Sequence, residues 1–274
     1  MSLKNILITG DCHGQVAGRM RVIQESMPEY KPEETAVIIL GDVGFLYYLD
    51  SSDQRCKKRA SEYGYTIYCV LGNHEARPSK DLGMRQINDE FVGGTVWIED
   101  EFPLIRYFCE WGIYNILGRR TLVVGGAYSV DKHYRIQRGM KWFENEQLNE
   151  FERDICLRNA SGYNPEFDLV LSHTCPYSLR PTDLFLNFID QSTVDTSMEK
   201  WMEVLKDKIE FKIWLYGHYH ADRIEAPYCE IFYFEVEDLK TIEARWDRYR
   251  KTGELDWWLP KSEKFYMFHK DKLE

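Results

Sequence analysis

Residues 5–14 read Asn5-Ile6-Leu7-Ile8-Thr9-Gly10-Asp11-Cys12-His13-Gly14, an apolar run that ends in a cluster of glycines and polar residues. Two later clusters have the same form, Leu40-Gly41-Asp42-Val43-Gly44 and Leu71-Gly72-Asn73-His74-Glu75. Asp11, Asp42 and Asn73 follow one another at intervals of 31 residues, about the length of one strand–helix unit with its return. In open α/β sheets, ligands bind outside the carboxyl ends of the strands. We therefore expect the three clusters at one edge of one sheet.

Other apolar, β-branched runs predict further strands that are buried on both faces. They span residues 36–40, 65–71, 121–124, 168–172 and 213–216. Helix-like stretches between the strands span roughly 15–27, 51–63, 80–91, 144–159 and 196–209. This alternation predicts an α/β architecture. Strand-like stretches with short links predict an antiparallel meander over 95–99, 104–110 and 113–117, with more antiparallel character near 231–236. We expect a mixed α/β fold.

The composition is that of a globular protein. Of the 274 residues, 44% are hydrophobic and 29% are charged. Since no repeat or domain boundary is visible, we expect a single domain over residues 1–274. From roughly 241 to 274 the sequence becomes charged and rich in tryptophan, with Trp246, Trp257 and Trp258. We expect this C-terminal extension to wrap around the body or to pack in an oligomer.

The charge balance argues against a large nucleic-acid surface. Lys and Arg number 35 and Asp and Glu 45, a net charge of −10, whereas sequence-independent nucleic-acid binding depends on surplus basic residues. No apolar run approaches the roughly 20 residues that span a bilayer, and the start lacks a signal-peptide pattern. The cysteines number seven and form no CxxC pair, which favours a reducing, cytoplasmic environment.

Two further clusters follow later strands, Ser172-His173-Thr174-Cys175-Pro176 and Tyr216-Gly217-His218-Tyr219-His220. Together the five clusters supply seven nitrogen and oxygen ligands: Asp11, His13, Asp42, Asn73, His173, His218 and His220. Mixed sets of this kind suit Mn, Fe or Zn better than Ca or Mg, and seven ligands suit two ions that share a carboxylate. A lone Asp after a strand is most often a turn residue or helix N-cap, and a lone buried His is most often structural. Five of the seven histidines lie in these clusters, which favours the metal site.

The five clusters resemble the motif set of the calcineurin-like metallophosphoesterase superfamily, which runs GD-x-HG, GD, GNHE, H and GH-x-H. The resemblance covers residues 9–220. It implies a four-layer α/β/β/α sandwich of two mixed sheets flanked by helices. It also implies a dinuclear site, with one ion held by Asp11, His13 and His220, a second by Asn73, His173 and His218, and both bridged by Asp42.

The same resemblance implies the chemistry of the site. A hydroxide that bridges the metals attacks phosphorus in line, and His74 donates a proton to the leaving oxygen. The ions are expected to be Mn and/or Fe, with Zn a further candidate. Because they neutralise charge on the phosphoryl group, an acidic protein can still bind phosphate. Glu75 either orients His74, pairs with a nearby cation or is a plain surface residue.

Departures from the motifs narrow the type of enzyme. Protein Ser/Thr phosphatases of the superfamily continue the second motif as GD-x-VDRG, whereas Phe45 and Leu46 stand here in place of Asp and Arg. This disfavours protein phosphatases and the related symmetrical dinucleoside tetraphosphatases. Phe45 also replaces the ligand Tyr of purple acid phosphatases. Residues 125–135 resemble the GGA-x-S-x-D loop of bacterial and phage-type members of unassigned substrate. The candidate substrate-binding residues are Arg77, His133 and Arg135, with a solvated basic loop as the alternative for the last two.

We therefore predict a metal-dependent hydrolase that acts on a phosphomonoester or a small phosphodiester. Its substrate would be a phosphorylated small molecule or a nucleotide. We expect no association with a membrane, and a homo-oligomer is compatible with the sequence. Two alternatives stay open. The first is a scaffold of the same fold that serves as a protein-interaction module. The second is a nuclease, which would need a local basic groove within the acidic total.

Overall fold

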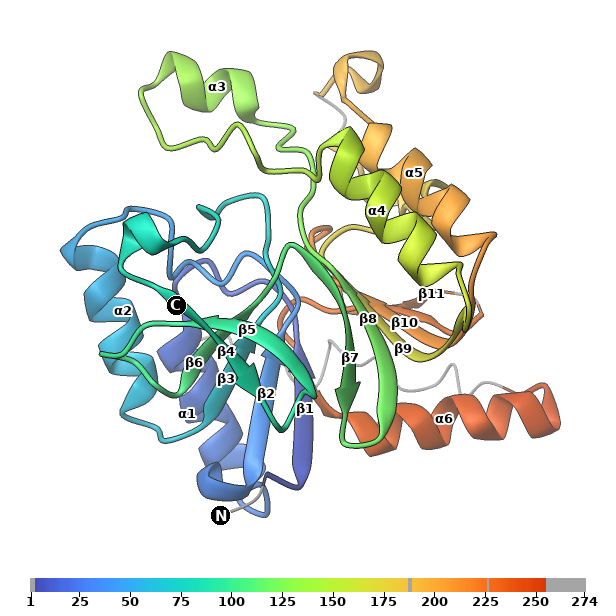
Figure 1. The fold of residues 1–274 in the computed structure, drawn as a ribbon, viewed down its shortest axis with the longest axis horizontal. Helices are drawn as coiled ribbons and strands as arrows, with labels where there is room; N and C mark the ends of the chain where they lie inside the picture. The colour runs from blue at the N-terminus through green and yellow to red at the C-terminus, as the bar shows by residue number, and fades with distance from the viewer. Residues whose placement is uncertain (1–2, 187–188, 226, 255–274) are drawn as a thin grey trace.

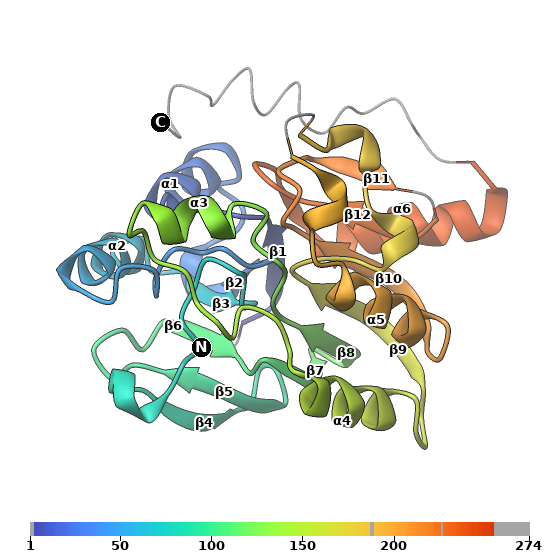
Figure 2. The same cartoon turned by 90° about the horizontal axis from the view of Figure 1, so that it is seen from above.

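Two mixed β-sheets pack face to face between helices in the computed structural model, which describes residues 3–186, 189–225 and 227–254 (Figures 1 and 2). The strands of the first sheet are β1 (Asn5–Thr9), β2 (Thr35–Ile39), β3 (Thr66–Cys69), β4 (Arg85–Asp89), β5 (Gly94–Ile98), β6 (Ile105–Phe108) and β13 (Val236–Asp238). Their order is β13-β1-β2-β3-β6-β5-β4. The second sheet contains β7 (Trp111–Ile116), β8 (Arg119–Val124), β9 (Glu166–Ser172), β10 (Glu210–Tyr216), β11 (Arg223–Glu225) and β12 (Cys229–Ile231), in the order β11-β12-β10-β9-β8-β7.

Parallel strands form the centre of each sheet. In the first sheet β1, β2, β3 and β6 are parallel neighbours, and in the second β8, β9, β10 and β12 are. The carboxyl ends of parallel neighbours lie at the same edge of a sheet. The polar clusters that follow these strands are therefore gathered at one edge of each sheet.

Helices cover the outer faces of both sheets. The α-helices are α1 (Val16–Ser26), α2 (Ser51–Ser61), α3 (Lys132–Gln137), α4 (Glu150–Ala160), α5 (Ser197–Lys206) and α6 (Leu239–Thr252). Short 3₁₀ turns lie at Pro32–Glu34, Lys80–Leu82, Tyr177–Leu179, Thr182–Leu184 and Gln191–Thr193. Helices α1 and α2 flank the first sheet, and α4 and α5 flank the second (Figure 2). The expected four-layer sandwich is confirmed.

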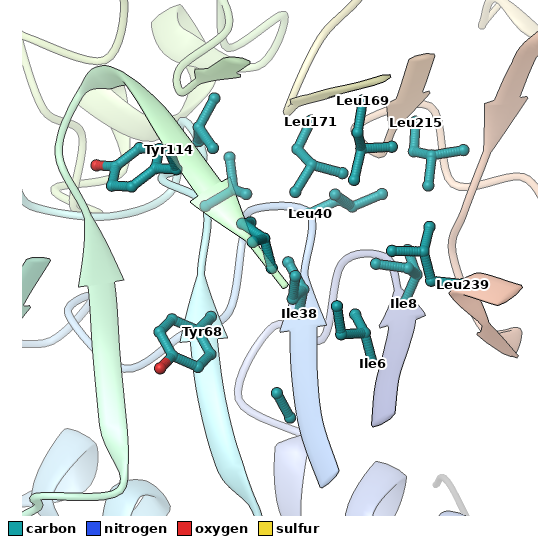
Figure 3. Packing of buried hydrophobic residues seen from close by; sticks show 14 of the residues in the cluster. Ile6, Ile8, Ile38, Leu40, Tyr68, Tyr114, Leu169, Leu171, Leu215 and Leu239 are labelled. Carbon is teal, nitrogen blue, oxygen red and sulfur yellow. The ribbon is translucent and has the colours of Figure 1, made fainter. Parts of the chain in front are cut away.

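Alternation along the strands produces these layers, because successive side chains point to opposite faces. Ile6 and Ile8 of β1 belong to the core between the sheets, together with Leu171 of β9 (Figure 3). Leu7, between them in sequence, packs instead with Met20 of α1 on the outer face. Strands buried on both faces require near-continuous apolar runs, as the sequence showed.

Two sequence-based expectations for the middle of the chain are wrong. The helix expected over 80–91 is a single 3₁₀ turn, Lys80–Leu82, followed by strand β4. Gly83 has the left-handed φ of 75°, which ends the turn, and β4 then pairs antiparallel with β5. The expected antiparallel meander is divided between the sheets, because β6 belongs to the first and β7 to the second. Of its three strands, β5 and β6 pair antiparallel, whereas β7 pairs antiparallel with β8, which lies outside the expected stretch.

The start of the expected C-terminal extension is part of the core. Residues 241–252 lie in α6, where Ile242 and Trp246 are completely buried beside the strands of both sheets. Trp257 and Trp258 lie outside the described residues. Among the helices of the described segments, none has the length and apolar character that a bilayer crossing would need.

Candidate active site

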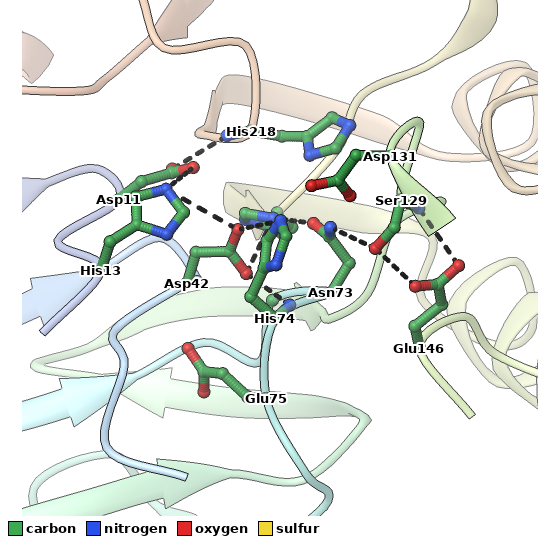
Figure 4. A network of polar contacts seen from close by, with 12 residues as sticks. Asp11, His13, Asp42, Asn73, His74, Glu75, Ser129, Asp131, Glu146 and His218 are labelled. Atoms are coloured by element: carbon green, nitrogen blue, oxygen red, sulfur yellow. Dashed lines mark hydrogen bonds and ion pairs between the residues drawn. The ribbon is translucent and has the colours of Figure 1, made fainter. Parts of the chain in front are cut away.

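The five polar clusters converge where the two sheets meet (Figure 4). Asp11, Asp42 and Asn73 come two to four residues after the ends of β1, β2 and β3, and His173 and His218 follow β9 and β10. Asp11, Asp42, Asn73 and His173 are each at most 2% exposed. The structure thus brings together all seven residues that the sequence singled out as ligands.

The backbone of these clusters is strained. Seven described residues other than glycine have positive φ, and four of them belong to the clusters: His13 (44°), Asp42 (47°), His218 (69°) and His220 (50°). Such conformations cost of order 1–3 kcal/mol each and persist where surrounding structure imposes them. Gly41 lets the chain pass the His173 ring, because a Cβ at Gly41 would overlap its Nδ1. A Cβ at Gly72 would likewise overlap the Asp42 carboxylate.

Asp11, His13 and His220 form the first group of converging atoms. Nε2 of His13 lies 2.9 Å from Nε2 of His220, and Nε2 of His220 lies 3.3 Å from Oδ2 of Asp11. Two ligands that each lie about 2.0–2.2 Å from one ion are separated by roughly 3–3.5 Å. Oδ2 of Asp11 is buried and accepts no well-formed hydrogen bond from the described residues. These atoms fit a cation between them.

Asn73 and His173 belong to a second group beside the first. Oδ1 of Asn73 lies 2.8 Å from Nε2 of His173, which lies 3.6 Å from Oδ1 of Asp42. The other oxygen of Asp42, Oδ2, lies 4.0 Å from Nε2 of His13 in the first group. His218 is tied to the cluster by its backbone N–H, which donates to Oδ1 of Asp11 at 2.9 Å. The Asp42 carboxylate therefore stands between the two groups.

The protonation states of the histidines in the cluster are also compatible with cation binding. Nδ1 of His173 lies 2.8 Å from the carbonyl of Leu40, so this nitrogen carries a proton and Nε2 faces the cluster. Although burial opposes the charged form, Asp42 raises the pKa of His173 to about 9. A cation bound among these atoms would take the place of the proton on Nε2. Burial, with His173 adding to it, lowers the pKa of His218 to about 3 and keeps this imidazole neutral, the form that binds metals.

His74 lies at the side of the cluster. Its Nε2 is 3.7 Å from Oδ2 of Asp42, and its backbone N–H donates to Oδ1 of Asp42 at 2.8 Å. Glu75 points away from His74 (Figure 4) and is completely buried. It accepts a hydrogen bond from the Val43 N–H, and burial raises its pKa to about 8. Glu75 therefore braces the turn of the second cluster and is not a surface residue.

Two residues outside the predicted set hold Asn73 in place. The Asn73 amide Nδ2 donates to Oγ of Ser129 at 2.8 Å, and Ser129 Oγ donates to Oε2 of Glu146 at 2.6 Å. Glu146 also accepts from the Ser129 N–H at 3.1 Å and from Trp142 Nε1 at 2.8 Å. This arrangement turns the Asn73 oxygen towards the cluster. Ser129 lies within the GGA-x-S segment that the sequence flagged, whereas no pattern marked Glu146.

The three candidate substrate residues have different placements. Arg135 lines a cavity of about 550 Å³ that opens onto the cluster, and it pairs with Asp131 at 2.7 Å and Tyr47 at 2.9 Å. Arg77 does not line this cavity. Its guanidinium donates to the carbonyls of Gly72 at 2.8 Å, Glu75 at 3.3 Å and Glu146 at 2.6 Å, so it braces the third cluster from behind. His133 is exposed on α3 and also lies outside the cavity lining.

Several solved structures are similar to this chain at low sequence identity. TT1561 of Thermus thermophilus aligns with a TM-score of 0.47 at 14% identity, over 86% of this chain and 98% of its own. The phosphopantetheinyl hydrolase PptH of Mycobacterium tuberculosis aligns with a TM-score of 0.42 at 12% identity, over 92% and 94%. A 5'-nucleotidase of Candida albicans SC5314 aligns with a TM-score of 0.39 at 12% identity, over 98% and 58%.

No curated protein sequence matches the chain. The family model of the calcineurin-like phosphoesterases matches residues 4–222, a span that begins just before β1 and includes every strand-end cluster described above. Because this match takes in well over half of the sequence, the chain belongs to the calcineurin-like phosphoesterase family.

Proposed function

We propose that this protein hydrolyses small phosphoesters with the help of two divalent cations. The observation that carries the proposal is the convergence of seven nitrogen and oxygen side chains, with the two oxygens of Asp42 turned to different groups. In the proposal Asp11, His13 and His220 hold one cation, Asn73, His173 and His218 hold the other, and Asp42 is shared. The mixture of imidazole, carboxylate and amide ligands favours Mn or Fe, with Zn a further candidate.

Two divalent cations, when bound to these residues, would polarise the phosphoryl oxygens and make a hydroxide nucleophile available near neutral pH. The protein's own contribution is to hold the ligands rigidly and to supply a proton. His74 fits the second task, because its imidazole borders the cavity beside Asp42. Burial lowers the pKa of His74 against the opposing effect of Asp42, which makes the imidazolium a stronger acid. We assign it the transfer of a proton to the leaving oxygen.

The cavity supports a small substrate. Its volume of about 550 Å³ lies within the range of pockets that bind small molecules. Arg135 stands on its wall, and its guanidinium is oriented by Asp131 and Tyr47, so we assign it to the phosphate group.

The net charge of −10 disfavours a large nucleic-acid substrate. Seven free cysteines support a reducing compartment such as the cytoplasm.

The test is a screen of the purified chain reconstituted with Mn²⁺, Fe²⁺ or Zn²⁺. The substrates are an aryl phosphate, an aryl phosphodiester, nucleotides and a phosphopeptide, with Asp42→Asn as the negative control. We expect turnover of the aryl phosphate or phosphodiester that requires metal and is lost in the variant. Absence of turnover with every metal and substrate would overturn the proposal in favour of a scaffold of the same fold.

A further inference from the structure

One cavity contains both the metal-binding cluster and a wall of apolar side chains. His13, Asp42 and His74 line its base, while Val130, Leu184, Phe185, Val194 and Tyr219 form much of its wall. Val130 comes from the loop after β8, and Leu184 and Phe185 from the segment after β9. A phosphoryl group at the cluster would therefore have its organic part against this wall.

The wall is apolar by construction. The hydroxyl of Tyr219 is 3.0 Å from Oγ1 of Thr174 and 3.6 Å from Sγ of Cys175, so its polar end is occupied inside the protein. The rings of Phe185 and Tyr219 are nearly parallel, at 15° with centroids 6.3 Å apart. Val130 and Leu184 are 41% and 42% exposed, and exposed apolar side chains gathered in one place mark a binding surface.

The charged groups of the cavity do not favour a polyphosphate. Outside the cluster, the charged side chains that line it among the described residues are Arg135, Arg180, Asp131 and Glu199, two of each sign. Arg135 is assigned above to the single phosphoryl group and is also paired with Asp131, so of these residues Arg180 would be the cation left for a second phosphate. Gln191 and Thr196 also line the cavity, but a nucleoside or a sugar would place many of its polar edges against Val130, Leu184 and Phe185, where they lack hydrogen-bond partners, which carries a desolvation cost.

We infer that the substrate is a monophosphate ester whose organic group is apolar, an aryl or alkyl group of several carbon atoms, and that Phe185 and Val130 select it. This inference rests on the proposed phosphoesterase function and adds the chemical class of its substrate. The cluster binds the phosphoryl group, and the apolar wall gains binding free energy from each methylene that leaves water.

A series of 4-alkylphenyl phosphates tests the inference, because lengthening the para chain from methyl to butyl leaves the leaving-group pKa almost constant. With the metal-reconstituted enzyme, kcat/KM is expected to rise about two- to fourfold for each added methylene. Phe185→Ala is expected to flatten this rise, measured as the ratio of kcat/KM for the butyl ester to that for the methyl ester. Val130→Ser, at a position that is 41% exposed, is a second variant for which the same flattening is expected. Phe151→Ala is the matched control, since Phe151 is 69% exposed on α4 and lies outside the cavity lining.

Binding of the non-hydrolysable 4-alkylbenzylphosphonates, followed by calorimetry, separates this inference from the proposed function. Turnover of phenyl phosphate with no dependence on chain length would overturn the inference and leave the hydrolase intact. Affinity that grows with chain length in the absence of any turnover would support the apolar site and overturn the hydrolase. Faster turnover of a nucleotide or sugar phosphate than of the butylphenyl ester would also overturn the inference.

Discussion

Replacing Ser129 by alanine tests how the protein orients Asn73, a proposed metal ligand, from behind. Oγ of Ser129 accepts a hydrogen bond from Nδ2 of Asn73 at 2.8 Å. The Ser129 hydroxyl in turn donates a hydrogen bond to Oε2 of Glu146 at 2.6 Å. When it is ionised, Glu146 can only accept from the Ser129 hydroxyl, so the lone pairs of that hydroxyl remain available to accept from Asn73. The pair therefore fixes which end of the Asn73 amide faces the cluster. Without Ser129, the amide can rotate and present its NH₂ group, which does not bind cations.

The magnitude follows from the bonds that are lost. The Asn73–Ser129 bond is neutral and stabilises by about 1 kcal/mol, and the Ser129–Glu146 bond involves a charged group and stabilises by about 1.5–3 kcal/mol. Glu146 keeps its bond from Trp142, so part of the network survives. Mutation of residues that support metal ligands in this way typically lowers the affinity for the metal by 10- to 100-fold. We expect Ser129→Ala to weaken the second cation by about this factor and to leave the first nearly unchanged.

The assay is calorimetric titration with Mn²⁺, with thermal unfolding as a check that the variant folds. Ser178→Ala is a matched control, because Ser178 also gives both its N–H and its hydroxyl to one carboxylate, that of Glu203, but outside the cavity lining. Two cations bound with unchanged affinity by a folded Ser129→Ala protein would refute the reasoning. Equal weakening in the Ser178 control would also refute it.

Four further substitutions probe the site and the core. Asp42→Asn should abolish turnover and weaken both cations, because the shared ligand loses its charge, and full activity with two tightly bound cations would contradict the dinuclear proposal. His74→Ala should keep both cations yet slow aryl phosphates with poor leaving groups most, whereas equal slowing across the series would argue against a proton donor. Arg135→Ala should raise KM about tenfold or more with a smaller effect on kcat, as the loss of a charged hydrogen bond predicts, and an unchanged KM would remove Arg135 from the site. Trp246→Ala should lower the free energy of unfolding in urea by about 3–5 kcal/mol, since the indole is completely buried and donates to Glu230, and a change below about 1 kcal/mol would show that α6 is dispensable.

The strands that end in polar clusters were predictable because their signal is local. Each of the first three apolar runs is followed within a few residues by Gly and a polar side chain, and the interval of 31 residues gives the parallel connection. The stretch 80–91 shows where local signals fail. Met84, Ile87 and Phe91 are spaced as on one face of a helix, yet β4 forms there because β5 offers an antiparallel partner along its whole length. A pairing partner about ten residues away is not part of the helical pattern.

The division of the meander between two sheets has a similar cause. Strand propensity predicts that 104–110 and 113–117 are extended, but it does not say which sheet each joins. The chain leaves the first sheet after Phe108 and enters the second at Trp111. Packing decides which sheet each strand joins, since the rings of Phe108 and Tyr114 meet edge to face in the core between the sheets.

Within the site, the residues that face the cluster were predictable and their supports were not. Ligand types at strand ends are recognisable from residue identity, whereas Glu146 acts through a contact with Ser129 that exists only after folding. Arg77 is the opposite case, a residue that the sequence assigned to the substrate and that the structure directs elsewhere. Its position directly after the third cluster suggested a cation for the phosphate, but its guanidinium turns back to three carbonyl oxygens. The direction of a long side chain depends on the neighbours available to it.

The strain in the clusters explains why glycine accompanies every one of these strand ends except that of His173. Four candidate ligands have φ between 44° and 69°, a conformation that a flexible loop would relax. Backbone hydrogen bonds oppose that relaxation: the N–H groups of Cys12 and His13 both donate to the carbonyl of Asp42, and the N–H of His218 donates to Asp11. These bonds bring neighbouring segments closer than a Cβ would allow, at Gly44 beside His13 and at Gly217 beside the Asp11 carboxylate. The glycines therefore serve rigidity rather than mobility, and the fold itself holds the candidate ligands in place.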